Sequence, residues 1–239
     1  MKTVCCIPAR LASTRFPRKV LALLGGKPLI ERTWERAMST ELFDDVVIAV
    51  DAEETRECAE SFGARTIMTA PSHVSGTDRL IEVASRYEGE FETWVNWQAD
   101  EPFVTERMIA DLLSGAKECD IATLSLPLLE GAGDPNIVKV VVDSGGRALY
   151  FSRSPIPHGG PWRAHVGLYA YSAEVLKTIE RLPPSRLEQL ERLEQLRYLE
   201  AGLLIVVKET AGDPLGIDTP EDLAMAEARL IDTAIKSIV

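Results

Sequence analysis

The stretch KTVCCIP (residues 2–8) decides the fold of this 239-residue chain, because it predicts a buried strand that leads directly into a long polar loop. A short, continuous apolar run is typical of a strand covered on both faces. The run DDVVIAVD (residues 44–51) has the same character, and the helical pattern LIERTWERAM (residues 29–38) lies between the two. A strand, a helix and a second strand in this order imply a right-handed βαβ unit and a parallel sheet.

The same alternation continues as far as Pro127. We predict further strands at residues 65–68, 93–98 and 120–128, and helices at residues 52–63, 76–87 and 105–116. Residues 136–152 then predict two strands around Ser144, Gly145 and Gly146, which is hairpin chemistry. The remaining patterns predict a strand at 165–171, a charged helix at 184–202, a strand at 203–209 and a final helix at 219–236. The sequence therefore predicts an α/β fold as one domain over residues 1–239, with a mostly parallel sheet flanked by helices and a smaller sheet lobe inserted at roughly residues 128–200.

Composition and charge exclude several classes of protein. No apolar run is long enough to span a bilayer, and the first residues lack the apolar region of a secretory signal, so we expect no membrane insertion. The four cysteines form no disulfide framework and favour a reducing cytoplasm. A formal net charge of -11 argues against a nucleic-acid partner. Any anionic ligand must therefore be held by a local concentration of cations.

Such a concentration follows the first strand, in the stretch IPARLASTRFPRK (residues 7–19), which has four cations and no acid. It matches neither a GxxxxGK[ST] phosphate loop nor a GxGxxG dinucleotide motif. It spreads Arg10, Ser13, Arg15 and Lys19 along a turn at the carboxyl end of a strand, where open α/β sheets bind ligands. Arginine forks and a lysine point charge suit several phosphate oxygens. A solvated basic loop is the alternative, but the missing local acids favour an anion site.

Two acidic motifs are expected to end near the same edge of the sheet. NWQADEP (residues 96–102) places Asp100 and Glu101 after an apolar strand, and GIDTPEDL (residues 216–223) places Asp218 just before a helix. Both patterns also suit an ordinary acidic turn and an ordinary helix start. If Asp100 and Asp218 face each other, their carboxylates could share one magnesium ion beside a triphosphate.

Two further motifs suggest contacts with the uncharged parts of a ligand. SGTDR (residues 75–79) contains a glycine turn that opens a helix, where backbone can approach a flat base edge. His73 precedes this turn and is either a catalytic acid or base or a solvent-facing loop residue. His165 is either a hydrogen-bonded strand residue or a polar group of a sugar pocket. Glu188 and Gln189 lie on a leucine-containing helix and could equally be ordinary surface residues.

Eight motifs taken in order resemble one family along nearly the whole chain, the 3-deoxy-manno-octulosonate cytidylyltransferases, or CMP-KDO synthetases. They are IPARLASTRFPRK, SGTDR, QADEP, DPNIVKVV, ALYFSRSPIP, HVGLYAY, LEQLERLEQLR and GIDTPEDL. The resemblance implies a Rossmann-like nucleotidyltransferase fold, usually dimeric, that joins CMP from CTP to KDO for lipopolysaccharide biosynthesis in the cytoplasm. It implies Mg²⁺ as the cofactor, CTP and KDO as substrates, and a homodimer.

The resemblance also implies roles for individual residues. The catalytic set is Arg10, Lys19, Asp100 and Asp218, of which Asp100 and Asp218 match the family's magnesium ligands. The nucleotide-binding set is Arg10, Ser13, Lys19, Gly76, Thr77, Arg79 and Gln98. The sugar-binding set is Arg15, His165, Tyr169, Glu188 and Gln189.

The chain departs from the family pattern at Ala99, at Arg186 and in the short loop HGGPWRA (residues 158–164). The last two lie on the sugar side. The alternatives are therefore a cytidylyltransferase for a related sugar acid, amino-substituted or like sialic acid, and a non-catalytic nucleotide-binding protein.

Overall fold

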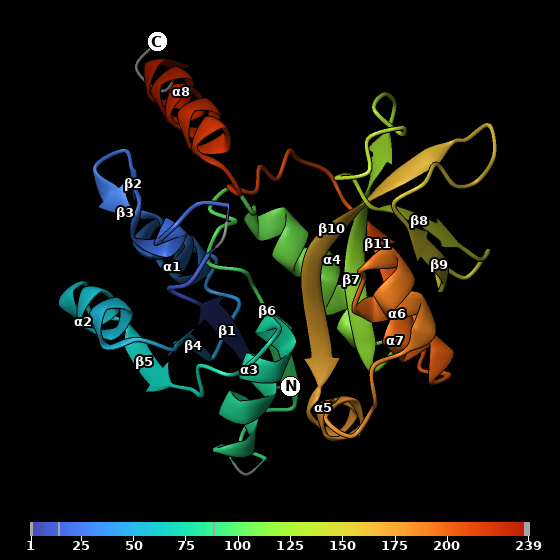
Figure 1. The fold of residues 1–239 in the computed structure, drawn as a ribbon, viewed down its shortest axis with the longest axis horizontal. Coiled ribbons are helices and arrows are strands. Elements are labelled where there is room, and N and C mark those ends of the chain that lie inside the picture. The colour runs from blue at the N-terminus through green and yellow to red at the C-terminus, as the bar shows by residue number, and fades with distance from the viewer. Residues whose placement is uncertain (1, 14, 88, 237–239) are drawn as a thin grey trace. The chain divides into compact units, whose positions relative to one another are not determined.

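The computed structural model describes residues 2–13, 15–87 and 89–236 of the chain (Figure 1). The chain forms two compact units. The N-terminal unit contains Lys2–Glu88, Asn96–Thr105 and Asp213–Val239, and the central unit contains Gly89–Val95 and Glu106–Gly212. The chain thus leaves the N-terminal unit and returns to it twice.

The N-terminal unit is built on three parallel strands in the order β1 (Thr3–Ala9), β4 (Asp45–Val50) and β5 (Arg65–Met68). All seven residues of β1 are buried, as its apolar sequence predicts. Three helices that pack against these strands are α1 (Leu29–Ser39), α2 (Glu53–Ser61) and α3 (Gly76–Ser85). Between β1 and α1 lie a short 3-10 helix η1 (Lys19–Leu21) and a small antiparallel pair, β2 (Leu23–Leu24) with β3 (Lys27–Pro28).

The last segment of the chain is fixed to the N-terminal unit by a small apolar core. Leu24 and Leu29 pack with Ile217 and Ala226, and all four side chains are fully buried. Helix α8 (Pro220–Lys236) begins directly after this segment. Asp222 accepts hydrogen bonds from the backbone of Asp218 and Thr219, and its own N–H donates to the Thr219 hydroxyl. Thr219 therefore caps the helix, and the cap fixes the backbone of Asp218.

The central unit carries a sheet of mixed direction. Its strands are β6 (Thr93–Asn96), whose last residue belongs to the N-terminal unit, β7 (Ile121–Leu128), β8 (Lys139–Val142), β9 (Ala148–Ser152), β10 (Trp162–Ser172) and β11 (Ile205–Glu209). Strand β11 runs parallel to β7, whereas β10 runs antiparallel to it, and β8 and β9 form an antiparallel pair. Its helices are α4 (Glu106–Ala116), α5 (Ala173–Ile179), α6 (Arg186–Glu191) and α7 (Gln195–Glu200).

The predicted α/β class with a mostly parallel sheet and a hairpin around Gly145 is confirmed. The predicted lobe at residues 128–200 falls inside the central unit, and its limits stay a prediction. The single helix predicted over 184–202 is wrong: the chain forms α6 and α7, separated at Arg192, which has a left-handed φ of 56°. Helix α5 was not predicted, because its seven residues give too short an apolar pattern.

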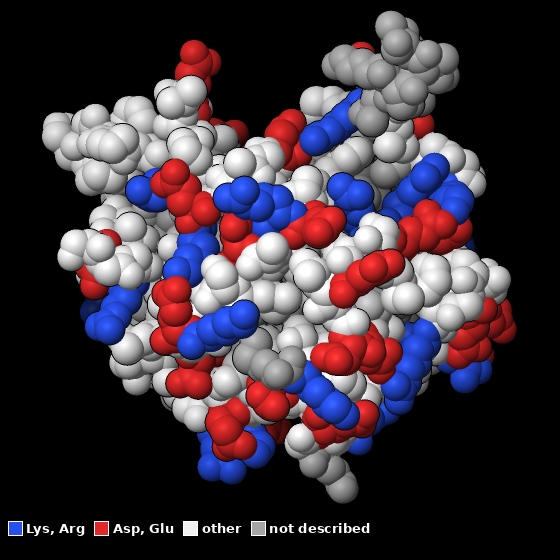
Figure 2. Space-filling view, turned by 180° about the vertical axis from the view of Figure 1, so that it is seen from behind, with Lys and Arg blue, Asp and Glu red and all other residues white. Residues whose placement is uncertain are grey.

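In the part of the chain that the structure describes, no helix is long and apolar enough to cross a membrane. Basic and acidic side chains are interspersed on the face drawn in Figure 2, as the mixed composition leads us to expect.

Candidate active site

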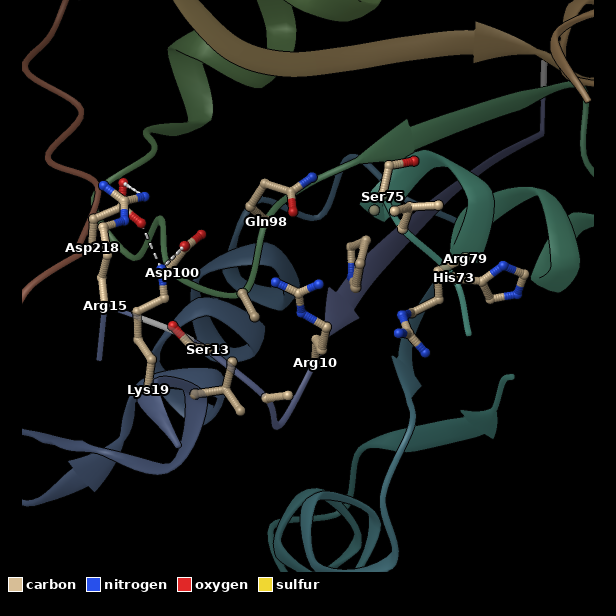
Figure 3. Close-up of a pocket in the computed structure, with 16 residues that line it drawn as sticks. Arg10, Ser13, Arg15, Lys19, His73, Ser75, Arg79, Gln98, Asp100 and Asp218 are labelled. Atoms are coloured by element: carbon tan, nitrogen blue, oxygen red, sulfur yellow. Dashed lines mark hydrogen bonds and ion pairs between the residues drawn. The ribbon is translucent and has the colours of Figure 1, made fainter. Parts of the chain in front are cut away.

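A cavity of about 270 Å³ opens at the carboxyl ends of the strands in the N-terminal unit. The segments that line it are the loop after β1, the turn before α3, the segment after β6 and the segment that leads into α8, and Figure 3 shows their side chains converging on it. The predicted catalytic and nucleotide-binding residues that line it are Arg10, Ser13, Lys19, Gly76, Arg79, Gln98, Asp100 and Asp218. Segments far apart in the sequence thus meet where parallel strands end, as the predicted topology requires.

Lys19 joins the two predicted metal ligands. Its ammonium nitrogen donates to Asp100 Oδ2 and, at 2.8 Å, to Asp218 Oδ1 (Figure 3). Asp218 also forms an ion pair with Arg15, whose Nη2 atom lies 2.9 Å from Oδ2 of Asp218. The Lys19 side chain is nearly buried, whereas Arg15 is largely exposed and Asp218 is half-buried. Asp100 and Asp218 therefore face a common point, which was the condition for a shared cation.

The charges of this cluster shift the pKa values of its members. Burial alone would lower the pKa of Lys19, but Asp100 and Asp218 outweigh it and the pKa is raised. Burial would raise the pKa of Asp218, but Lys19 and then Arg15 outweigh it and the pKa is lowered. Burial raises the pKa of Glu101 to about 8, with further contributions from Asp100 and Asp218. At neutral pH Glu101 is therefore mostly protonated.

Arg10 and Ser13 belong to the loop after β1 and line the same cavity, with Ser13 drawn beside Lys19 in Figure 3. Among the described residues, neither side chain has a hydrogen bond or ion pair with another residue. Arg10 is exposed and Ser13 is half-buried. A guanidinium and a hydroxyl that folding does not use are available for an anionic ligand.

The turn before α3 brings backbone close to Gln98. Ser75 and Asp78 form a reciprocal capping box at the start of the helix. A Cβ atom placed on Gly76 would lie 2.9 Å from Gln98 Nε2, so only glycine leaves room for this side chain. Gln98 Nε2 donates to Asn96 Oδ1 at 2.9 Å, and Asn96 in turn contacts the Thr77 hydroxyl at 3.4 Å. The buried Asn96 and Thr77 therefore fix the amide of Gln98 from behind.

Arg79 lines the cavity, but its charge is paired inside the protein. Its side chain is almost fully buried and its Nη2 lies 3.1 Å from Asp51 Oδ2. Its Nη1 donates to the hydroxyl of Thr69. The predicted contact of Arg79 with a nucleotide is thus not the main use of its guanidinium in this structure.

The other predicted sugar residues belong to the central unit. His165 and Tyr169 are neighbours on β10, with ring centroids 5.4 Å apart, and Phe151 packs on the other edge of the imidazole. The Nε2 atom of His165 lies 3.0 Å from the Thr123 hydroxyl. Burial lowers the pKa of His165 to about 3, so the ring is neutral at physiological pH.

Glu188 and Gln189 lie on α6 in the same unit. The Glu188 carboxylate accepts the backbone N–H of Ser185 at 3.0 Å in a capping box, and Arg197 Nε lies 3.6 Å from it. Gln189 is exposed. The sugar-binding roles of these residues stay predictions.

Comparison with known proteins identifies relatives of this chain. A family model described as cytidylyltransferase matches residues 4–208. The chain is 45% identical to the 3-deoxy-manno-octulosonate cytidylyltransferase of Thermodesulfovibrio yellowstonii, over 95% of this chain and 97% of the relative. It is 44% identical to the protein of the same name from Syntrophobacter fumaroxidans, over 98% and 99% of the two chains. The chain belongs to the 3-deoxy-manno-octulosonate cytidylyltransferase family.

Solved structures agree with the family. A structure of CMP:2-keto-3-deoxy-manno-octonic acid synthetase complexed with CTP superposes with a TM-score of 0.92 at 39% identity, covering 98% of this chain and all of that one. A 4-diphosphocytidyl-2C-methyl-D-erythritol synthase from Anaerococcus prevotii superposes with a TM-score of 0.67 at 11% identity, which shows the fold alone. The protein is accordingly an enzyme of the nucleotidyltransferase class.

The donor set of this cytidylyltransferase fits a magnesium ion. Asp100 and Asp218 supply carboxylate oxygens that already converge on one cation, the Lys19 ammonium. Within the described residues, no group of three or more histidine, cysteine or acidic side chains could hold a metal. Magnesium commonly binds one or two carboxylates and completes its shell with water and substrate phosphates, so two carboxylates are sufficient.

Two residues that support the cytidylyltransferase site from behind were not predicted from the sequence. Asp51 contacts Arg79, and Asn96 contacts Gln98. Asp51 ends the predicted strand 44–51 and Asn96 lies in the last half of the predicted strand 93–98, near the edge where the ligand-binding loops were expected. That position was the available signal, but their partners lie on other segments and could not be identified from spacing.

Proposed function

We propose that this chain transfers CMP from CTP to 3-deoxy-D-manno-octulosonate (KDO) and releases pyrophosphate, a step of lipopolysaccharide biosynthesis. The observation that carries the proposal is the meeting of Lys19, Asp100 and Asp218 in the same cavity as the unpaired Arg10. Cations for a triphosphate and carboxylates for its metal ion are the two requirements of phosphoryl-type transfer. The substrates in this proposal are inferred from the family to which the chain belongs.

In the proposed reaction the anomeric 2-hydroxyl oxygen of KDO forms a bond to the α-phosphorus of CTP. The bond between this phosphorus and the oxygen of the β-phosphate breaks, pyrophosphate leaves with the electron pair, and the hydroxyl proton is lost to solvent. Arg10 and Ser13 bind phosphate oxygens. Lys19, whose raised pKa keeps it charged, stabilises the negative charge that develops on the phosphates.

Magnesium bound by Asp100 and Asp218 would supply a Lewis acid that draws charge from the phosphate oxygens. The chain's own residues contribute positioning, since Asp218 is held by the cap of α8 and Asp100 by the hydrogen bond from Ile217 N–H to its backbone carbonyl, 2.9 Å long. Fixed placement of reacting groups is a major part of catalysis in reactions of this kind.

The nucleoside is proposed to lie against the turn that begins α3, where Gly76, Thr77 and Gln98 are brought together. Arg79, on the same helix, lines the cavity next to them. Arg15 is proposed to bind the KDO carboxylate, because a guanidinium fork matches two carboxylate oxygens. His165, Tyr169, Glu188 and Gln189 are proposed to contact the sugar hydroxyls.

We also propose that the enzyme acts as a homodimer in the cytoplasm. The central unit exposes several large apolar side chains that a partner could cover, namely Leu129, Leu149, Leu190 and Leu204. Analytical ultracentrifugation at micromolar concentration tests this, and a single monomeric species would contradict it.

The activity is tested by release of pyrophosphate from CTP with a panel of sugar acids: KDO, its amino-substituted analogue and a sialic acid. We expect release with KDO that depends on both CTP and magnesium. Release without sugar would indicate simple hydrolysis. No release with any sugar acid, from a chain that binds CTP, would contradict the proposed function, and preference for sialic acid would contradict the assignment of the sugar.

A further inference from the structure

The two carboxylate oxygens of Asp51 contact two different segments that line the cavity. It follows the last residue of β4, and its Oδ1 atom accepts the backbone N–H of Leu11 at 3.0 Å. Its Oδ2 atom lies 3.1 Å from Nη2 of Arg79. Leu11 belongs to the loop after β1, and Arg79 stands on α3 one turn after Gly76. One carboxylate therefore connects the loop to the helix.

The contact between Asp51 and Arg79 lies in the interior of the protein. Only 7% of the Asp51 side chain and 2% of the Arg79 side chain are exposed. The guanidinium has further acceptors in the Thr69 hydroxyl and, at 3.5 Å, the carbonyl of Ala70. Thr69 itself donates to the carbonyl of Val50, the residue before Asp51, at 2.8 Å. A paired and hydrogen-bonded network of this kind holds its members in one arrangement.

The two contacts of Asp51, with Leu11 and with Arg79, each affect the cavity. The hydrogen bond from Leu11 N–H fixes the peptide unit that joins Arg10 to Leu11, and therefore the point from which the Arg10 side chain extends. The pair with Arg79 neutralises a cation that lines the cavity, so that Arg10, which has no ion pair among the described residues, remains to meet an anion.

We propose that Asp51 is a positioning residue of the nucleotide site. It tethers the loop that carries Arg10 and Ser13 to the helix that carries the nucleoside turn. It acts on a nucleoside triphosphate only through these segments. The inference rests on the proposed function to the extent that CTP is the ligand of this cavity.

The test compares Asp51→Asn with Asp51→Ala. Asparagine retains a side-chain oxygen for Leu11 N–H, whereas alanine retains none, and both leave Arg79 without its anion. We expect Asp51→Ala to bind CTP at least tenfold more weakly than Asp51→Asn in calorimetric titration. Hydrogen–deuterium exchange in the peptide that contains residues 10–13 should be faster in Asp51→Ala without any ligand.

An unpaired buried guanidinium is costly, so both variants are also made in an Arg79→Gln background, where no buried charge is left alone. In that background the Asn variant at position 51 should still bind CTP more tightly than the Ala variant. The two variants are compared under conditions in which their thermal stabilities are equal.

The chain offers a matched control in Asp44, at the opposite end of the same strand. Its Oδ2 atom accepts the backbone N–H of Thr3 at 2.7 Å, as Asp51 accepts that of Leu11 at the other end of β1. Asp44→Ala should lower thermal stability and leave CTP affinity within twofold of wild type.

Equal CTP affinity and equal exchange of residues 10–13 in the Asn and Ala variants would overturn the inference, as would an equal loss of affinity in Asp44→Ala. The proposed function is judged separately. A wild-type chain that binds CTP but releases no pyrophosphate with KDO would contradict that function, while the position 51 comparison would still be decided by affinity and exchange.

Discussion

The cationic loop after β1 and the aromatic cluster of β10 were both predicted to bind substrate, but folding uses their side chains differently. Arg10 and Ser13 line a cavity, and neither has a partner among the described residues. His165 packs between Phe151 and Tyr169 and contacts Thr123. Polar groups that folding leaves unused in a cavity are stronger evidence for a ligand than polar groups already engaged in a core.

The pKa shifts express the same difference. Lys19 and Asp218 stabilise each other's charged forms, so this region of the N-terminal unit retains ionised groups at neutral pH. Burial removes the charge from His165 in the central unit. The first region can therefore meet charged ligands, whereas the second is an uncharged part of the core.

The strongest test of the first region removes one carboxylate at a time. Asp100→Asn and Asp218→Asn should each lower the rate of pyrophosphate release on the order of a hundred- to a thousand-fold, because each removes charge that holds the cation at the phosphates. The rate is measured at saturating CTP and KDO, with circular dichroism to confirm the fold. Glu101→Gln is the matched control, since Glu101 is mostly protonated at neutral pH and should tolerate the change. Near-normal rates for both aspartate variants at limiting magnesium would contradict the assignment.

The sequence could predict this region because its signals are local. An apolar run predicts β1, and the absence of acids from residues 7–19 marks the loop that follows. A shared cation site required Asp100 to face Asp218, and the fold brings both carboxylates onto Lys19. The role of Asp51 was not predictable, because its partners Leu11 and Arg79 lie 40 and 28 residues away and no periodicity connects them.

The helix predicted over residues 184–202 fails for a related reason. Its leucines continue at helical spacing through Arg192, which supports a single helix. The backbone nevertheless turns left-handed at Arg192, where Arg153 contacts the carbonyls of Glu191 and Arg192. Contacts from Arg153, the residue that follows β9, thus determine where α6 ends, and the local sequence pattern does not contain them.

A test of the second region uses acid. The pKa of His165 is lowered to about 3 in the folded chain, against about 6.5 when unfolded, so the unfolded chain binds more protons between these values. The stability that the neutral ring contributes is therefore present above pH 6.5 and lost as the pH falls toward 3. His165→Gln should weaken this acid dependence by a few kcal/mol in the free energy of unfolding, measured with urea between pH 4 and pH 7.

The control for this experiment is His158→Gln, in an exposed loop of the same unit. Its acid dependence should equal that of wild type. If His165→Gln also kept the wild-type dependence, the imidazole would not be held neutral in a core, and the contrast between the two regions would lose its basis.

A smaller effect is expected at the nucleoside turn. In Gly76→Ala the new methyl group would approach the amide of Gln98 to within 2.9 Å, and because this is the end of a flexible side chain, Gln98 should rotate away. That movement breaks its contact with Asn96, and we expect CTP affinity to fall about tenfold, which corresponds to about 1.4 kcal/mol. Thermal stability should not fall, since alanine favours a helix more than glycine does. Gly133→Ala, at a position with open space around the new methyl group, should leave affinity unchanged; an unchanged affinity in Gly76→Ala would place the nucleoside elsewhere.

The smallest effect is expected at Glu188, where a predicted sugar contact and a folding role compete for one carboxylate. Its Oε2 atom accepts the Ser185 N–H at 3.0 Å and lies 3.6 Å from Arg197 Nε. Glu188→Ala removes both contacts and should cost about 1 kcal/mol of unfolding free energy, as loss of a cap usually does.

Glu188→Gln separates the two roles, because glutamine can close the same capping box without the charge. Its unfolding free energy should stay within about 0.5 kcal/mol of wild type, since the contact with Arg197 is long and partly exposed. If the carboxylate also accepts hydrogen bonds from KDO hydroxyls, the KM for KDO should rise severalfold in Glu188→Gln while CTP affinity is unchanged. An unchanged KM in this stable variant would leave Glu188 as a helix cap alone. The sugar site would then have to be sought among residues whose polar groups folding has left free, as it has at Arg10 and Ser13.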